Sequence, residues 1–225
     1  TLNITPEYAR SILDDLKVKQ LRLSAHWPLT EPKDGVYNFS ELDFQMKEAE
    51  KRGVSVILAV GRRLPGWPEC HEPAWLPDYE EDHKELEESL ESENELLFRY
   101  IEKVVNRYKN YPNLLYWQVE NEPFLGFFGR SSCHSLKKSE LEEEIALFKK
   151  LDDHHPVLVT DSGEFGTWYN AYRSGDVFGT SIYVYVWWKN FLGPIRYPIT
   201  PAFFRIKHNV IKLFFGSKPS MVIEL

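Results

Sequence analysis

The feature that most constrains the fold of this chain is a regular alternation between short apolar runs and longer amphipathic segments. Residues 54–60 form a near-continuous apolar run, which is typical of a β-strand covered on both faces. Residues 97–108 instead place their apolar side chains three and four positions apart, which is the spacing of one helical face. A chain built from such alternating units predicts an α/β fold with a parallel sheet.

The alternation covers the whole sequence without a linker or a low-complexity break. Pro6 and Pro201 stand in the first turn of predicted helices, Gly216 ends the helix that Pro201 opens, and Gly53 ends another, as is usual at helix termini. The predicted strands are residues 20–25, 54–60, 114–119, 156–160, 177–186 and 219–223.

Six strands in 225 residues fit two architectures. One is a TIM (β/α)₈ barrel that is incomplete and contains strands 2 to 7 with their helices, since a full barrel has eight units of roughly 31 residues. The other is an open sheet. No glycine-rich phosphate loop follows the first strand, which disfavours a nucleotide-binding open sheet. We expect one partial barrel domain over residues 1–225.

Two of the predicted strand ends carry a glutamate directly after an apolar run. Barrel enzymes place their catalytic groups at the carboxyl ends of strands, and glycosidic bond cleavage needs a pair of carboxyl groups there. Glu122 and Glu224 are 102 residues apart, whereas three barrel units predict roughly 94. The two side chains are therefore expected to face each other across the barrel mouth.

Residues 115–123 (Leu-Tyr-Trp-Gln-Val-Glu-Asn-Glu-Pro) resemble the fourth-strand motif of clan A glycoside hydrolases, the retaining β-glycosidases. The resemblance implies that Asn121 binds the 2-hydroxyl of the sugar and that Glu122 is the acid/base. It also implies that Glu224 is the nucleophile, that Arg22 lies beside it and that Tyr183 hydrogen-bonds to it. The segment 27–43, with its Glu-Pro-x-x-Gly-x-Tyr-x-Phe pattern, is similar to the second βα loop of cellulase-like and β-galactosidase-like members.

These roles predict opposite protonation states for the two carboxyls. Glu122 should have a raised pKa so that it can protonate the leaving oxygen, whereas Glu224 must stay ionised to attack the anomeric carbon. The predicted reaction is double displacement with retention of configuration, and the carboxyl separation expected for it is ~5–5.5 Å. An alternative is a catalytically inactive carbohydrate-binding barrel, or a fragment of one.

Loops at the predicted barrel mouth supply further candidates for sugar contacts. His26 and Trp27 follow the first predicted strand, and Trp67 and His71 follow the second. Aromatic residues make up 15% of the chain, and their faces can stack on the apolar faces of sugar rings. A well-filled core would explain the same richness.

The expected partner is an oligo- or polysaccharide, with no metal and no cofactor. The net charge of −7 argues against nucleic acid, which needs a basic surface, and no run approaches the ~18 apolar residues of a membrane segment. We expect a secreted or cell-envelope location if a leader has been removed, and a cytoplasmic one otherwise. Cys70 and Cys133 can pair, but two cysteines leave the compartment open.

Overall fold

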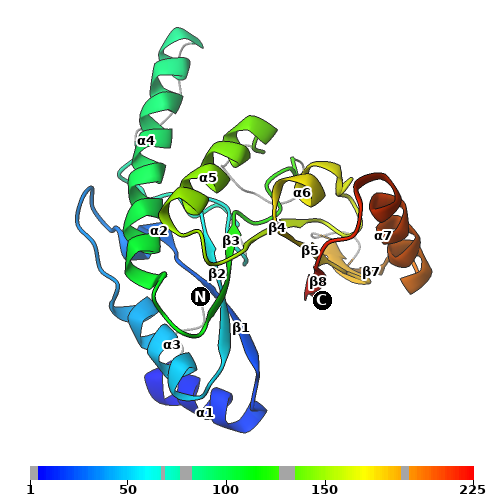
Figure 1. Ribbon diagram of the computed structural model, residues 1–225, viewed down its shortest axis with the longest axis horizontal. Coiled ribbons are helices and arrows are strands. Elements are labelled where there is room, and N and C mark those ends of the chain that lie inside the picture. Colours follow the sequence, from blue (N-terminus) through cyan, green and yellow to red (C-terminus); the bar gives the residue numbers. More distant parts are fainter. Residues whose placement is uncertain (1–4, 67–68, 77–82, 127–134, 189–192) are drawn as a thin grey trace.

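The computed structural model describes residues 5–66, 69–76, 83–126, 135–188 and 193–225, with side chains of the fourth helix described from residue 94 onward. Within these ranges six parallel strands form one sheet that curls into a half-barrel (Figure 1). Their order in the sheet is β1 (Gln20–Ser24), β2 (Ser55–Val60), β3 (Leu114–Val119), β4 (Val157–Asp161), β5 (Val177–Ser181) and β8 (Ser220–Glu224). Each strand pairs with the next strand of the sheet, which is the order of a barrel and confirms the incomplete TIM barrel.

Helices connect the strands and pack on the outer side of the curl (Figure 1). They are α1 (Pro6–Leu16), α2 (Trp27–Thr30), α3 (Ser40–Lys51), α4 (His83–Tyr108), α5 (Lys138–Leu151), α6 (Tyr169–Ser174) and α7 (Pro201–Phe215). None of the helices in the described ranges combines the length and the apolar character that a membrane span requires.

The sheet is apolar on both faces, as the near-continuous apolar run in β2 predicts. Val56, Leu58 and Val60 belong to the large core between the sheet and the helices. Ile57 points to the opposite face and joins a smaller cluster with Leu158. Because successive side chains of a strand point to opposite faces, one run fills both cores.

The predicted strand over residues 177–186 is wrong in its second half. β5 ends at Ser181, and Ile182 N still donates to the carbonyl of Glu224 at 2.9 Å. The chain then leaves the sheet and forms β6 (Tyr185–Trp188), which pairs antiparallel with β7 (Gly193–Arg196). Both halves are rich in β-branched and aromatic residues, so composition alone does not separate them.

The loop after β1 is organised by a buried carboxylate. The side chain of Glu31 is fully buried and accepts hydrogen bonds from Trp27 Nε1 at 2.7 Å, Gly35 N at 2.9 Å and an Arg99 guanidinium nitrogen at 3.0 Å. In the same loop the rings of Tyr37 and Phe39 stack 5.9 Å apart. The glutamate, glycine, tyrosine and phenylalanine of the Glu-Pro-x-x-Gly-x-Tyr-x-Phe pattern therefore contact one another or buried neighbours and hold the loop in shape.

We predict that Glu31→Ala destabilises the protein by about 3 kcal/mol, because it removes a buried charge from three donors, one of them charged. Urea denaturation should show a lower midpoint with an unchanged slope. Glu50→Ala, which removes an exposed carboxyl from α3, is the matched control and should stay within about 0.5 kcal/mol of wild type. A Glu31→Ala variant as stable as the control would contradict this role.

Candidate active site

The carboxyl ends of β1, β3, β5 and β8 bring five polar side chains together. Arg22 lies near the end of β1, Asn121 and Glu122 follow β3, Tyr183 follows β5 and Glu224 ends β8. The structure therefore joins all five residues that the sequence assigned to the centre of the site. They meet because the ends of parallel strands open on the same rim of a barrel.

Arg22 is the hub of this cluster. Its guanidinium forms an ion pair with Glu224, donates from Nη2 to Asn121 Oδ1 at 2.6 Å and donates from Nε to Gln118 Oε1 at 2.7 Å. The second carboxyl oxygen of Glu224 accepts a hydrogen bond from the Tyr183 hydroxyl at 2.6 Å. Glu224 thus has a cation on one oxygen and a hydroxyl donor on the other, which are contacts that suit a carboxylate.

Glu122 occupies a different environment. It is 5% exposed, and its Oε1 accepts one hydrogen bond, from the Ser181 hydroxyl at 2.7 Å. Its backbone N–H donates to Thr160 Oγ1 at 2.9 Å, and its φ of 44° is left-handed. Burial raises the pKa of Glu122 to about 8; the Ser181 hydrogen bond opposes this rise, and the charge of Glu224 adds to it. Burial without a cationic partner keeps a carboxyl protonated near neutral pH.

A third carboxyl group, Glu69, lies in the loop that follows β2. Burial raises its pKa, the Arg63 charge opposes this and the Glu224 charge adds to it. One of its oxygens is 3.5 Å from a guanidinium nitrogen of Arg63, whose side chain is 1% exposed. Sequence reasoning missed Glu69, because an acidic residue in a loop carries no signal of its own.

Ser181, Thr160 and Gln118 were also missed, although they contact Glu122, Asn121 or Arg22. Each is a fully or almost fully buried polar residue in a strand or at a strand end. A polar side chain inside an otherwise apolar strand is the signal that could have identified them.

Comparisons with known proteins identify a family for this chain. The model of glycoside hydrolase family 42, described as beta-galactosidase, matches residues 7–140. The chain belongs to this family. It lies within the clan A glycoside hydrolases that the motif at Asn121 and Glu122 resembles.

The chain is also similar to individual relatives. A probable mannan endo-1,4-beta-mannosidase C from Aspergillus terreus is 36% identical over 93 residues, which are 35% of this chain and 22% of that protein. A GH5_18 protein from Streptomyces cattleya, solved in complex with GlcNAc, superposes with a TM-score of 0.61 at 17% identity. The match covers 81% of this chain and 47% of the Streptomyces protein.

A beta-galactosidase from the haloarchaeon Halorubrum lacusprofundi gives a TM-score of 0.54 at 15% identity, over 79% of this chain and 37% of that one. The Streptomyces and Halorubrum structures share the fold of the present chain. The chain therefore spans about a fifth of the mannosidase and less than half of either structure.

The remaining predicted site residues of this glycoside hydrolase chain are Trp27, His26, His71 and Trp67. Trp27 is fully buried, stacked on Tyr100 at 5.1 Å, and the structure does not bring it into the cluster. His26 and His71 contact each other edge to face at 4.5 Å, and burial together with the charge of His71 lowers the pKa of His26 to about 4. Trp67 lies outside the described residues.

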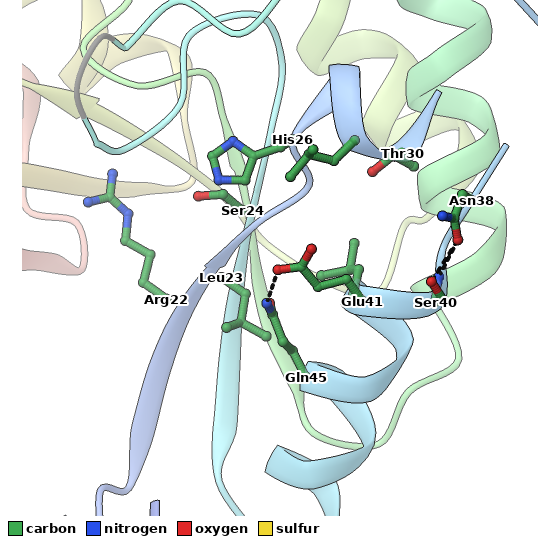
Figure 2. A pocket seen from close by; sticks show the side chains of 11 residues that line it. Arg22, Leu23, Ser24, His26, Thr30, Asn38, Ser40, Glu41 and Gln45 are labelled. Atoms are coloured by element: carbon green, nitrogen blue, oxygen red, sulfur yellow. Dashed lines mark hydrogen bonds between the residues drawn. The ribbon is translucent and has the colours of Figure 1, made fainter. Parts of the chain in front are cut away.

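A pocket of about 390 Å³ opens between β1 and α3, beside the cluster (Figure 2). Arg22 and His26 line it together with Glu41 and Gln45, and neither Glu122 nor Glu224 does. Figure 2 shows the Arg22 guanidinium pointing away from Glu41 and Gln45. Arg22 thus separates this pocket from the carboxyl pair.

The described residues contain no group of three His, Cys, Asp or Glu side chains arranged to hold a metal ion. Cys70 is disulfide-bonded. The other cysteine of the sequence, Cys133, lies outside the described residues.

We predict that Glu122 is protonated at pH 7, because burial raises its pKa to about 8. The infrared difference spectrum between wild type and Glu122→Gln should show the C=O stretch of a protonated carboxyl at pH 7 and its loss above pH 9. Glu41→Gln, which changes an exposed carboxyl, should show no such band. A carboxylate band in the Glu122 difference spectrum at pH 7 would contradict the assignment.

Proposed function

We propose that this chain carries the catalytic pair of a retaining glycoside hydrolase that cleaves β-linked glycosides by double displacement. Glu122 is the acid/base and Glu224 is the nucleophile. The observation that supports this most directly is the contrast between the two carboxyls, since Glu122 is buried with one hydroxyl donor and Glu224 is paired with Arg22. The proposal treats residues 1–225 as one partial barrel domain.

In the first step Glu224 attacks the anomeric carbon while Glu122 donates its proton to the leaving oxygen. A covalent glycosyl ester forms and the aglycone departs with the proton. Ester formation removes the negative charge of Glu224, and the loss of that charge lowers the pKa of Glu122. Glu122 is then suited to accept a proton from water, which attacks the anomeric carbon, breaks its bond to the Glu224 oxygen and releases the sugar with its configuration retained.

The surrounding side chains have positioning roles in this proposal. Arg22 donates to Asn121 Oδ1, so the Asn121 amide nitrogen is the end of that side chain available to donate a hydrogen bond to a sugar hydroxyl oxygen. Tyr183 holds Glu224 through Oε2. His26, His71 and Trp67 are proposed contacts to the sugar at the rim, and the partner is an oligo- or polysaccharide. The names of the relatives, beta-galactosidase and mannan endo-1,4-beta-mannosidase, favour β-galactosides and β-mannosides as first substrates.

We predict that Glu122→Gln lowers kcat/KM of the protein that contains this chain on aryl β-glycosides by about 10²–10⁴-fold, the usual contribution of a general acid or base. Glu224→Gln should abolish turnover, and Glu41→Gln should leave it unchanged. Proton NMR of the first product formed by wild type should show the β-anomer. An α-anomer would overturn retention, as would a carboxyl separation of ~8 Å in a crystal structure. Sugar binding without hydrolysis would favour the inactive-barrel alternative.

We predict that Ser181→Ala shifts the alkaline limb of the kcat/KM profile to higher pH. The acid form of Glu122 is lost as the pH rises through about 8, so this loss sets the limb. The Ser181 hydroxyl stabilises the ionised form, and its removal raises the pKa of Glu122. A hydrogen bond to a charged group is worth roughly 1.5 kcal/mol, which corresponds to about one pH unit. A limb that stays in place or moves down would contradict this contact, and Ser174→Ala on α6 is the control.

A further inference from the structure

The residue before the Asn121-Glu122 turn, Glu120, has a side chain that points into the protein. Glu120 is fully buried and has a left-handed φ of 58°. Its Oε1 accepts the backbone N–H of Arg62 at 2.8 Å and its Oε2 accepts the backbone N–H of Arg63 at 2.6 Å. Arg62 and Arg63 stand just after the end of β2. One carboxylate therefore fastens the end of β3 to the end of β2.

Gly61 makes room for this contact. A Cβ atom at this position would lie 2.3 Å from Glu120 Oε1 and 2.4 Å from its carboxyl carbon, and the φ of Gly61 is 145°. Both the close approach and the backbone angle exclude any other residue without displacement of the Glu120 carboxylate. The end of β2 is thus shaped to receive that group.

A second buried carboxyl meets Glu120 from the helix layer. Glu144 of α5 is 3% exposed, and its carboxyl lies next to that of Glu120. Burial and the Glu120 charge raise the pKa of Glu144 well above its ordinary value, which favours a protonated Glu144 beside Glu120. Burial also raises the pKa of Glu120 to about 7, and the hydrogen bonds from the backbone N–H groups of Arg62 and Arg63 oppose this rise. The other charged groups that face the pair are Arg62 and Arg63 from the β2 end and Glu140 from α5.

The backbone of Glu120 is held as well. Gln118 Nε2 donates to the Glu120 carbonyl at 2.8 Å, and Gln118 Oε1 accepts from Arg22. Glu120 and Glu122 both have left-handed φ values, which are strained for residues other than glycine and persist only where contacts enforce them. The contacts of the Glu120 carboxyl with the end of β2, and of its carbonyl with Gln118, hold the backbone in this conformation.

We infer that Glu120, with Glu144 packed beside it, is a positioning residue that holds the Asn121-Glu122 turn so that the Glu122 carboxyl faces Ser181 and the leaving oxygen. The inference rests on the proposed function of Glu122. It assigns a role to two buried carboxyls that take no part in the chemistry.

The kinetic test compares leaving groups, since a good leaving group needs little help from an acid. Glu120→Ala should lower kcat/KM on a phenyl β-glycoside by about 10²-fold, because a misplaced Glu122 loses most of the contribution of a general acid. On a 2,4-dinitrophenyl β-glycoside the loss should be less than about fivefold. Glu48→Gln, which neutralises a buried carboxyl on α3 that pairs with Arg10, Lys51 and Arg52, should change neither. Equal losses on both substrates, or no loss, would overturn the inference.

A pair of Glu144 variants tests the same inference in case Glu120→Ala fails to fold. Glu144→Gln keeps a side-chain donor for Glu120 and should retain most of the phenyl glycoside activity, whereas Glu144→Leu should lose about tenfold more on phenyl than on dinitrophenyl glycosides. Equal behaviour of the two Glu144 variants would overturn the inference.

A crystal structure of Glu120→Ala or Glu144→Leu separates this inference from the proposed function. The contact between Ser181 Oγ and Glu122 Oε1, which is 2.7 Å in wild type, should be lost. If it is kept, the positioning role is wrong whatever the kinetics show. If Glu122→Gln hydrolyses phenyl glycosides as well as wild type does, the proposed function fails and the contact alone decides whether Glu120 positions Glu122.

Discussion

The ion pair between Arg22 and Glu224 is the interaction on which the rest of the site depends. Arg22 belongs to β1 and Glu224 to β8, which are the two edges of the described six-stranded sheet. In a flat sheet four strands would separate these edges by far more than a side chain can reach, at ≈ 4.8 Å per strand. The contact exists because the sheet curls and brings its two edge strands within reach of each other's side chains. The hydrogen bonds of Asn121 and Gln118 to Arg22 then bring the end of β3 to the same centre.

The curl also explains how two glutamates of one site acquire different chemistry. Glu224 sits on the edge strand, where its side chain is 20% exposed and Arg22 can reach it. Glu122 sits after an inner strand, where neighbours on both sides exclude water and a single serine hydroxyl bonds to its carboxyl. The position of a strand in the half-barrel thus decides which partners its carboxyl meets. Desolvation is the larger influence on Glu122, and the charge of Glu224 only adds to it.

Much of this arrangement could be predicted from sequence, because strands of a parallel sheet are apolar on both faces and end on one rim. The six strands and the meeting of Arg22, Asn121, Glu122, Tyr183 and Glu224 followed from that rule and from the motif around Glu122. The break between β5 and β6 did not, because it is set by long-range contacts such as that of Tyr183 with Glu224. Ser181, Glu69 and Glu120 were missed because their roles depend on which backbone N–H or carboxyl faces them across the sheet, and no local pattern records this.

The loop after β1 shows why likeness to a family and participation in its chemistry are separate questions. Trp27 and the Glu31 pattern are part of what makes the segment resemble its relatives, yet both are buried and satisfied by each other at 2.7 Å. The same hydrogen bond fixes the chain that follows β1, and Arg22 lies on that strand. A residue can therefore belong to a family resemblance because it holds the scaffold of the site. Glu31 is buried and its carboxylate is hydrogen-bonded on both oxygens. Glu122, the proposed acid/base, accepts a hydrogen bond from the Ser181 hydroxyl among the described residues, and burial raises its pKa.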